Sequence, residues 1–380
     1  MSYPKKKIAI IGSQAFALWN FRGPLIREMV KRNLEVYALA PDYDDETRKK
    51  VEQLGAKSVP YRLSRTGLNP FRDTWDFLSL IFTLRKIKPD VTFSYTIKPV
   101  IYGTLAAWIL GIPRRFAMIP GLGYAFTVPE ERDEWKRRVV RRIAQFLYKL
   151  ALRKTTKVFF QNPHDLNEFV QKGIVHPEKA FLSGPTGVDL QAFPPVPPVT
   201  APITFLLAAR LLREKGIREF VEAARQIKAK YPDTRFVLLG GLDTNPGAIS
   251  REEVEGWVKE GLIEWPEHVA DVRPYLAQAS VFVLPSYYRE GVPRSIQEAM
   301  AMARPIITTD APGCRETVIP GVNGFLVPVC DVDALVLAME RFIQEPELIE
   351  RMGKESRRIA EERFDVHKIN KTLLEEMHLL

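Results

Sequence analysis

Residues 281–310, VFVLPSYYREGVPRSIQEAMAMARPIITTD, contain the pattern that decides the fold. The apolar runs 281–285 and 305–310 predict two buried strands, and the stretch between them predicts a Gly-Val-Pro turn followed by a helix. Strand, helix and strand in this order are typical of a βαβ unit with parallel strands. Two carboxylates lie within it: Glu290 just before the turn and Glu298 just inside the helix.

The same alternation runs through most of the chain. In the first half, strands are expected in KIAIIG (7–12), EVYALA (35–40), DVTFSY (90–95), RRFAMI (114–119) and KVFFQN (157–162). In the second half they are expected in ITFLLAAR (203–210), RFVLLGG (235–241), LIEW (262–265), VFVLP (281–285) and PIITTD (305–310). Several are apolar throughout, as in parallel sheets covered by helices on both faces. The fold class is therefore α/β, with doubly wound parallel sheets.

Six prolines interrupt the alternation between residues 185 and 202. Proline interrupts helices and central strands, so a semi-rigid linker is expected there. We predict an N-terminal Rossmann-like domain at 1–190, a linker at 191–202 and a second domain at 203–364. Ligands of such domains bind at the carboxyl ends of the strands, and two facing domains leave a cleft between them. The tail from about 331 to 380 is predicted to be helical.

Composition limits the class of protein. The formal charge of +9 and pI of about 9.4 favour an anionic partner, whether nucleic acid, a membrane surface or a phosphorylated small molecule, although a merely basic soluble protein is the alternative. Two cysteines in 380 residues favour a reducing compartment. No apolar run approaches the ~18 residues of a membrane-spanning helix. The longest, FLSLIFTL (77–84) and LAAWILGI (105–112), are expected to be buried helices.

Two features of the second domain suit a diphosphate. Arg210 ends a predicted strand and Lys215 begins the next helical pattern, so two cations flank one loop. Pro293 is expected as the first helical residue, which would leave amides at the helix start free to bind an anion. These are the amides of Gly291, Val292, Arg294 and Ser295. The alternative for the cations is a solvated basic loop.

The first strand ends in Gly12, where the backbone could approach a ligand, or where the chain simply turns into a helix. The stretch after it lacks the G-x-G-x-x-G pattern, which excludes a nicotinamide-binding interpretation. In the second domain, the alternative for Glu290 and Glu298 is surface charge, in which Glu298 forms an exposed helical ion pair with Arg294, four residues away. This alternative accounts for Glu298 but leaves Glu290 unexplained. A ligand that bears hydroxyls, then an anion, then hydroxyls again, such as a sugar diphosphate ribonucleoside, accounts for both carboxylates.

These residues resemble the donor site of family-4 glycosyltransferases, retaining enzymes of GT-B architecture that use nucleotide sugars. The resemblance covers nearly the whole chain. In the second half it is carried by AARLLREKGI (208–217), ADVRPYL (270–276), PSYYREGVPRSIQEAMA (285–301), RPIITTDAPGCRETV (304–318) and GVNGFLV (321–327). SRTGLNPF (64–71), YTIKPVIYGTLAA (95–107) and PGLGYAF (120–126) resemble a subgroup that elongates undecaprenyl-diphosphate-linked glycans, including transfer of N-acetylgalactosamine in bacterial N-glycosylation.

The resemblance implies a role for each matching residue. Arg210 and Lys215 would hold the donor diphosphate, with support from the amides after Glu290, and no metal would be required. Glu298 would accept hydrogen bonds from ribose hydroxyls, and Glu290 would bind the transferred sugar and face the reacting centre. The resemblance also implies that helix 365–380 returns to the first domain.

One departure concerns the first domain. Many members carry a histidine after the fourth strand, but this chain has none before His164. The matching stretch has Thr96 and Lys98, and Lys98 and Arg65 are candidates for binding the carrier diphosphate. The alternative for both cations is a solvated loop position. In a retaining transfer, the leaving phosphate can itself take the proton of the acceptor.

The segment 132–154 predicts a basic amphipathic helix. At about 100° per residue, one face is apolar; it is formed by Val139, Val140, Ile143, Phe146, Leu147 and Leu150. The other face carries Arg137, Arg138, Arg141, Arg142 and Lys149. Such a helix suits an anionic membrane surface, with Trp135 and Tyr148 at the interface. The alternative packs the apolar face on the sheet. No nucleic-acid-binding module is recognisable.

We therefore predict a UDP-sugar-dependent hexosyltransferase that acts on a lipid-linked acceptor. It would be cytoplasmic and peripherally bound to the inner membrane. Two alternatives stay open: a soluble transferase with a small-molecule or free sugar acceptor, and a nucleotide-sugar-binding regulator without turnover.

Overall fold

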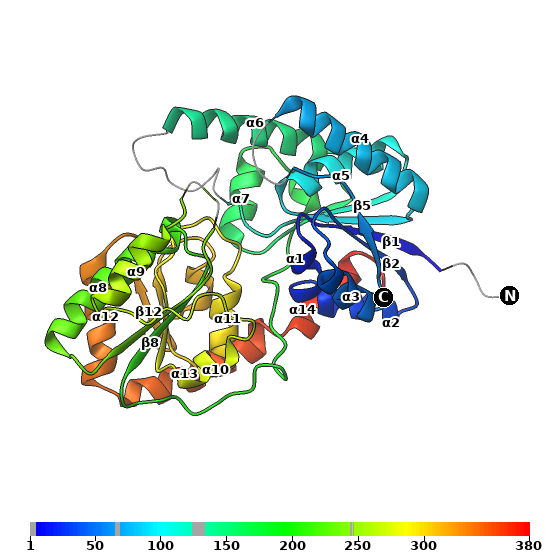
Figure 1. The fold of residues 1–380 in the computed structure, drawn as a ribbon. Coiled ribbons are helices and arrows are strands. Elements are labelled where there is room, and N and C mark those ends of the chain that lie inside the picture. Colours follow the sequence, from blue (N-terminus) through cyan, green and yellow to red (C-terminus); the bar gives the residue numbers. More distant parts are fainter. Residues whose placement is uncertain (1–4, 65–68, 124–133, 244, 246) are drawn as a thin grey trace. The chain divides into compact units, whose positions relative to one another are not determined.

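The structure is a computed structural model that describes residues 5–64, 69–123, 134–243, 245 and 247–380 (Figure 1). The chain forms two compact units. The first contains residues 1–186 and 366–380, and the second contains residues 187–365. The expected domains were 1–190 and 203–364, so the units divide a few residues earlier at the first boundary and include the proline-rich segment in the second unit.

The sheet of the first unit has the strand order β3-β2-β1-β4-β5-β6-β7 among the described residues, and all its strand pairs are parallel. Its strands are β1 (Lys7–Ile11), β2 (Glu35–Ala40), β3 (Lys57–Pro60), β4 (Val91–Tyr95), β5 (Arg114–Ile119), β6 (Lys157–Phe160) and β7 (Ala180–Leu182). Its helices are α1 (Ala15–Asn20), α2 (Gly23–Lys31), α3 (Asp45–Gln53), α4 (Pro70–Ile87), α5 (Ile97–Ile109), α6 (Glu134–Leu152), α7 (Pro163–Gln171) and α14 (Val366–Glu376).

The sheet of the second unit has the order β12-β11-β10-β8-β9, also parallel. Its strands are β8 (Thr204–Ala208), β9 (Arg235–Leu239), β10 (Val281–Leu284), β11 (Ile306–Thr309) and β12 (Gly324–Val327). Its helices are α8 (Ile217–Lys230), α9 (Arg251–Lys259), α10 (Arg273–Gln278), α11 (Arg294–Ala301), α12 (Val332–Gln344) and α13 (Glu347–Arg363).

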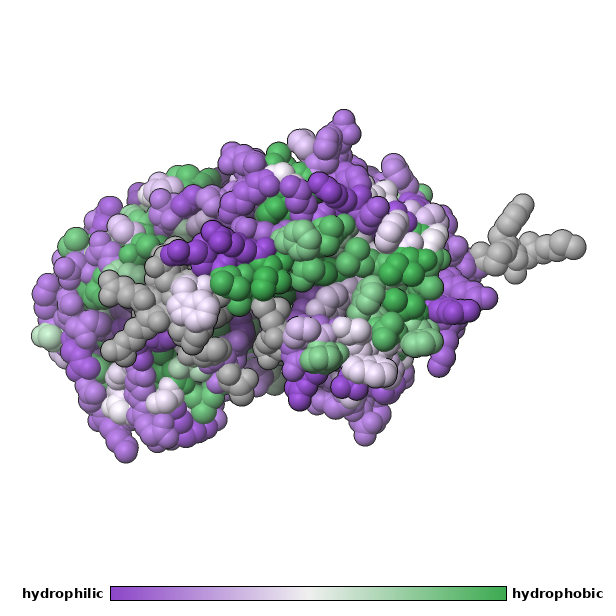
Figure 2. Space-filling view, turned by 90° about the horizontal axis from the view of Figure 1, so that it is seen from above, coloured by the Kyte–Doolittle hydropathy of each residue, from purple (hydrophilic) through white to green (hydrophobic). Residues whose placement is uncertain are grey.

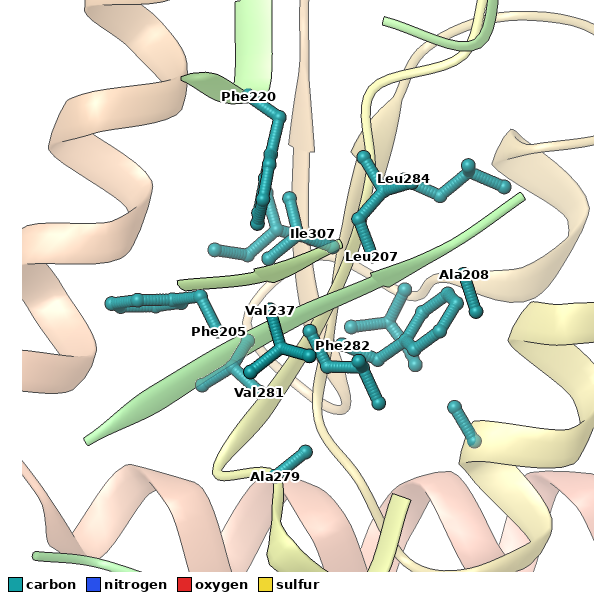
Figure 3. Close-up of a cluster of buried hydrophobic side chains, with 14 of the residues drawn as sticks. Phe205, Leu207, Ala208, Phe220, Val237, Ala279, Val281, Phe282, Leu284 and Ile307 are labelled. Atoms are coloured by element: carbon teal, nitrogen blue, oxygen red, sulfur yellow. The ribbon is translucent and has the colours of Figure 1, made fainter. Parts of the chain in front are cut away.

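The strands at the centre of each sheet are apolar and buried inside their unit. Every residue of β8 and β10 is buried, and the close-up in Figure 3 shows Phe205, Val281 and Phe282 among the side chains of this core. Phe236 packs against Phe205 and Phe220, with ring centroids 5.1 Å and 5.5 Å apart. Strands buried on both faces are what continuous apolar runs predict.

Nine of the ten expected strands are confirmed in the described residues, and the βαβ unit at 281–310 is β10, α11 and β11. The strand expected at 262–265 is wrong, because only a single bridge joins Glu264 to Val237. Strands β3, β7 and β12 were not expected. The helical tail is confirmed as α12, α13 and α14, with short breaks between them.

The proline-rich segment expected as a linker is packed on the second unit. Val188 has no exposed surface, and its amide donates to the carbonyl of Phe364 over 2.7 Å. The buried guanidinium of Arg304 donates to the carbonyl of Val196 over 2.8 Å. Residues 187–202 thus have partners on the second unit near the start and in the middle of the segment.

The C-terminal segment 366–380 belongs to the first unit. Helix α14 packs against α2, and Lys157 forms an ion pair with Glu376. The guanidinium of Arg114 donates to the carbonyl of His378 over 3.1 Å. In the part of the chain that the structure describes, no helix combines the length and the apolar character needed to cross a membrane.

Candidate functional site

The strand order of the second unit locates a binding position. Strand β8 pairs with β9 on one side and with β10 on the other, so the chain reverses direction of winding between β8 and β10. In doubly wound sheets, ligands bind outside the carboxyl ends of the strands at such a switch point. Arg210 and Lys215 follow β8 there, and Glu290 follows β10. The fold therefore brings these three residues to the same edge of one sheet.

Lys215 and Glu290 form an ion pair across the two loops. Their side chains are only 9% and 17% exposed, and the hydroxyl of Ser286 also donates to Glu290 Oε1 over 3.0 Å. Weak solvent screening makes such a pair stronger than one at the surface. The carboxylate is thus held in one orientation at the end of β10.

Gly216 lets the two loops approach each other. Its φ is +75°, and a Cβ placed there would lie 2.2 Å from the carbonyl oxygen of Pro285. The backbone amides of Tyr287 and Tyr288 donate to the carbonyl of Glu214 over 2.9 Å and 3.0 Å. Main-chain contacts therefore join the loop after β8 to the loop after β10, independently of the ion pair.

The aromatic ring of Tyr288 lies beside both cations. Lys215 Nζ is 5.4 Å and Arg210 Cζ is 5.9 Å from the ring centroid. Both distances are within about 6 Å, where a cation is attracted to the ring face. Tyr288 thus helps to place the two positive charges side by side, although sequence reasoning assigned it no role.

Asp243 is a further residue of this site that sequence reasoning missed. Arg210 Nη1 lies 3.1 Å from Asp243 Oδ2, and the arginine is half-exposed while the aspartate is largely buried. Burial opposes ionisation of Asp243, but the hydrogen bond from the amide of Asn245 and the charge of Arg210 hold its pKa below the usual range. A carboxylate in the loop after β9, the strand beside β8, was the available signal.

Glu298 lies on α11 with its side chain mostly buried. Its Oε1 is 2.9 Å from Nε of Arg294, so the helical ion pair considered from the sequence is present. Burial raises the pKa of Glu298, and the charge of Arg294 opposes this effect. The buried position of the pair distinguishes Glu298 from a surface carboxylate.

The start of α11 differs from the expectation in one respect. Pro293 is the N-cap and not the first helical residue, which is Arg294. Gly291, Val292 and Pro293 are buried, whereas Arg294 and Ser295 are partly exposed. The outward direction of the four amides at the helix start stays a prediction. Ser295 and Arg294 remain at the helix start, where the dipole favours an anion.

Gln297 supports the turn before α11 and was also missed. It is fully buried, its side-chain nitrogen donates to the carbonyl of Val292 over 3.0 Å, and its oxygen accepts from the amide of Gly187 over 3.0 Å. A glutamine in an amphipathic helix gives no sequence signal for such a role, because the same residue is common on exposed faces.

The first unit has an equivalent switch point between β1 and β4. Gly12 follows β1, and a Cβ there would lie 2.4 Å from the hydroxyl oxygen of Tyr95, so packing alone already requires glycine. Thr96 follows β4, and its hydroxyl donates to Ser13 Oγ over 3.1 Å. Its φ of +68° is strained for a β-branched residue. Backbone strain of this kind is more common at functional sites.

Lys98 is neither a loop residue nor solvated, so the alternative of a solvated loop position is wrong, whereas its role at the carrier diphosphate stays a prediction. It is the second residue of α5, and its side chain is 10% exposed. Its ammonium lies 2.8 Å from Asp73 Oδ1 and donates to the carbonyl of Ser64 over 2.7 Å. The ammonium is therefore already neutralised within the unit. Arg65, the other candidate, lies outside the described residues.

The basic helix is confirmed as α6. Of its candidate residues, Trp135, Arg138 and Arg142 are exposed and Arg141 is partly exposed, while the side chain of Arg137 lies outside the described residues. The alternative that packs the apolar face on the sheet is wrong, because most of that face is exposed: Val139, Ile143, Phe146 and Leu150. Tyr148, expected at an interface, is buried in the core instead.

Within the described ranges, no group of three or more His, Cys, Asp or Glu side chains is arranged to hold a metal ion. The charged groups identified at the switch point of the second unit are therefore side chains. Two cations, the two carboxylates of Glu290 and Glu298, and the start of α11 could together hold a ligand with an anionic centre and hydroxyl-bearing ends.

Family models match parts of both units. Residues 19–183 match the family model described as glycosyl transferase 4-like domain, and residues 202–345 match that of the glycosyl transferases group 1. The chain is 31% identical over 332 residues to the N,N'-diacetylbacillosaminyl-diphospho-undecaprenol alpha-1,3-N-acetylgalactosaminyltransferase of Campylobacter jejuni, with 84% of each chain covered.

Two further similarities concern another transferase and a solved structure. The UDP-Gal:alpha-D-GlcNAc-diphosphoundecaprenol alpha-1,3-galactosyltransferase of Escherichia coli is 26% identical over 317 residues, which cover 80% of this chain and 78% of that one. The sucrose-phosphate synthase of Thermosynechococcus elongatus superposes with a TM-score of 0.79 at 19% identity, covering 98% of both chains. That likeness bears on the fold alone.

Proposed function

This chain belongs to the group 1 glycosyltransferases, enzymes that transfer sugars, and we propose that it uses a UDP-linked hexose or N-acetylhexosamine as donor. The acceptor in this proposal is a saccharide on a polyprenyl diphosphate, as in assembly of bacterial surface or glycoprotein glycans. Transfer proceeds with retention of the anomeric configuration, at the cytoplasmic face of the inner membrane.

The observation that carries the donor proposal is the convergence of Arg210, Lys215 and Glu290 at the β8/β10 switch point. Arg210 and Lys215 bind the diphosphate, and Glu298 accepts hydrogen bonds from the ribose hydroxyls. Glu290 binds hydroxyls of the transferred sugar next to the reacting carbon. The cations are placed where negative charge grows as the sugar–phosphate bond breaks, which is where electrostatic stabilisation lowers the barrier most.

The ion pairs of the site suggest how the donor diphosphate is bound. Lys215 is paired with Glu290 and Arg210 with Asp243. A diphosphate provides two anionic groups that can share or replace these partners, so the cations are neutralised both before and after donor binding. In the proposed transfer, the leaving diphosphate accepts the proton of the attacking hydroxyl, and no metal ion is required.

The acceptor proposal rests on the names of the relatives. Both the Campylobacter jejuni and the Escherichia coli transferases are named for undecaprenyl-diphosphate-linked acceptors. In the first unit, Thr96 and Ser13 stand at the switch point and are the residues that we place nearest to the acceptor. Lys98 stays a candidate for the carrier diphosphate, which would have to share or replace its carboxylate partner Asp73, as proposed for Lys215 and Glu290.

Calorimetry with UDP and a transfer assay test the proposal. The wild-type protein is expected to bind UDP and to transfer label from a UDP-sugar to lipid extracts, giving a product whose anomeric configuration matches the donor. Arg210→Ala is expected to weaken UDP binding. Arg218→Ala is the matched control, because Arg218 loses the same charge but pairs with Glu253 on α9.

Three results separate the proposal from its alternatives. UDP binding without transfer to any lipid or sugar acceptor would indicate a regulator without turnover. Transfer to free sugars but not to lipid extracts would replace the lipid-linked acceptor by a soluble one. Equal UDP affinity in the Arg210 and Arg218 variants would remove the assigned diphosphate site.

A further inference from the structure

Helix α4 carries two opposed apolar stripes. One faces the core and contains Leu80, Leu84 and Ile87. The other is exposed and contains Phe71, Trp75, Leu78 and Phe82, at intervals of four, three and four residues. At about 100° per residue, these intervals align the four side chains along one line of the helix, on the side opposite to the buried stripe. The expectation that residues 77–84 form a simply buried helix is therefore only half correct.

Helix α6 repeats this arrangement. Its buried stripe contains Ala144, Tyr148, Ala151 and Leu152. Its exposed stripe contains Trp135, Val139, Ile143, Phe146 and Leu150, at intervals of four, four, three and four residues. Phe71 is 83% exposed, and Trp135 and Phe146 are 66% and 62% exposed, so more than half of each side chain is accessible to solvent. A helix that is apolar on two sides needs a partner on both.

The two exposed stripes lie on the same side of the first unit. Helices α4 and α6 each pack against α5, and both lie above the sheet in Figure 1. The space-filling view onto this side shows apolar side chains gathered in one band over these helices (Figure 2). We call this band, defined by the two exposed stripes, the α4/α6 face. Exposed apolar side chains that form one contiguous patch are typical of binding surfaces.

Among the described side chains of α4 and α6, the charges beside the α4/α6 face are positive. Among the described side chains of the two helices, the exposed or partly exposed basic ones are Arg72, Arg85, Lys86, Arg138, Arg141, Arg142 and Lys149. The aspartates of α4 are turned inward: Asp73 pairs with Lys98, and Asp76 is buried and accepts from the amide of Ser64. The border of the apolar band is thus positive.

We propose that the α4/α6 face docks on an anionic lipid bilayer, with the two helices lying in the plane of the interface. The exposed aromatic and aliphatic side chains enter the boundary between headgroups and acyl chains, and the arginines and lysines beside them contact lipid phosphates. The proposal deepens the membrane location proposed above and extends it from α6 to α4. Only the identity of the membrane, the inner membrane, rests on the proposed function.

A bilayer fits this face better than a second copy of the chain. Two copies meeting face to face would bring positive borders together, which costs electrostatic free energy. Anionic lipids neutralise those borders instead. Trp75 and Trp135 also place an amphipathic ring on each helix, as is common at membrane interfaces.

Flotation of the full chain with vesicles tests the proposal. The vesicles contain phosphatidylglycerol and phosphatidylethanolamine, without any sugar-bearing lipid, so that binding does not depend on acceptor recognition. Binding is expected to fall with added salt and to be weak on pure phosphatidylcholine. The variants Trp75→Gln/Phe82→Gln on α4 and Trp135→Gln/Phe146→Gln on α6 are each expected to lower the partition coefficient at least about tenfold.

Matched controls come from the second unit. Leu337 is 63% exposed on α12, and Leu337→Gln is expected to leave flotation unchanged. Arg138→Gln/Arg142→Gln should weaken binding to anionic vesicles, whereas Arg351→Gln on α13 should not. Since the replaced side chains are exposed, the variants are expected to fold, and an unchanged melting temperature checks this.

Quenching by brominated phospholipids gives a second readout. Emission of the wild-type protein is expected to be quenched, and quenching is expected to decrease in Trp75→Phe and in Trp135→Phe. Vesicle binding that survives both α4 and α6 variants overturns the proposal. So does a dimer that the same variants dissociate while the wild-type protein fails to float. Loss of UDP binding with flotation retained would contradict the donor site and leave the docking surface standing.

Discussion

Lys215 and Glu290 form a largely buried ion pair that joins the loop after β8 to the loop after β10. The pair has a structural as well as a functional consequence. Removing one partner leaves the other charge poorly solvated, which destabilises the folded state more than removing both. The same two residues stand where the proposed donor would bind.

For Glu290, we expect Glu290→Ala to reduce transfer at least about a hundredfold and to destabilise the protein by about 1–3 kcal/mol, because Lys215 loses its partner. Lys215→Ala/Glu290→Ala should be more stable than the sum of the single variants predicts. Chemical denaturation of all four proteins measures this coupling. Additive losses of stability would show that the pair is not energetically linked.

For Arg210 and Asp243, opposite effects on UDP affinity are expected. Arg210→Ala removes a cation and should weaken binding about tenfold to a hundredfold. Asp243→Asn removes the anion that competes for Arg210, and should tighten binding severalfold at low ionic strength. Calorimetry at two salt concentrations measures both. Weaker binding in Asp243→Asn would mean that Asp243 chiefly orients Arg210.

Through Glu298, the free energy of unfolding is expected to depend on pH. Burial raises its pKa, so the folded state holds this proton more tightly than the unfolded state does. The stabilisation that comes from the proton is present at low pH and is lost as the pH rises through the raised pKa. At neutral pH, the ionised carboxylate therefore costs stability.

The corresponding variant is Glu298→Gln. At neutral pH, its melting temperature should exceed that of the wild-type protein, and its free energy of unfolding should be larger by less than about 1 kcal/mol. This advantage should disappear towards pH 4. UDP affinity should fall in the same variant, because an amide accepts hydroxyl hydrogen bonds less strongly than a carboxylate does. A lower melting temperature at neutral pH would show that the pair with Arg294 outweighs the burial of the charge.

Gly216 is expected to tolerate no side chain. Gly216→Ala places a Cβ against the Pro285 carbonyl at a φ of +75°, so both stability and transfer should fall. Gly256→Ala on α9 is the control: no atom lies within 4 Å of its Cβ, and the variant should gain about 0.5–1 kcal/mol. Thermal unfolding distinguishes the two. Equal melting temperatures would contradict the close approach of the two loops.

The core strands were predictable because each is a continuous apolar run. Strands β3 and β7 were missed for the opposite reason: they lie at the edges of the sheet, are partly exposed and contain few residues. The strand predicted at LIEW (262–265) was wrong because this run forms only one bridge, at Glu264. Among site residues, Arg210, Lys215 and Glu290 were identifiable because each follows a strand. Asp243 depends on the side-by-side arrangement of β8 and β9, which spacing alone does not show.

By itself, the sequence determined the alternation of strands and helices, the division into two parallel-sheet units and the residue types at the ends of β8 and β10. Local periodicity and strand-end positions carry that information. Only the tertiary structure decided which charges neutralise one another, as Lys98 does with Asp73 and Lys215 with Glu290. It also decided that α4 and α6 present a second apolar stripe outward. Periodicity shows that residues share one side of a helix, but only packing determines which side is covered.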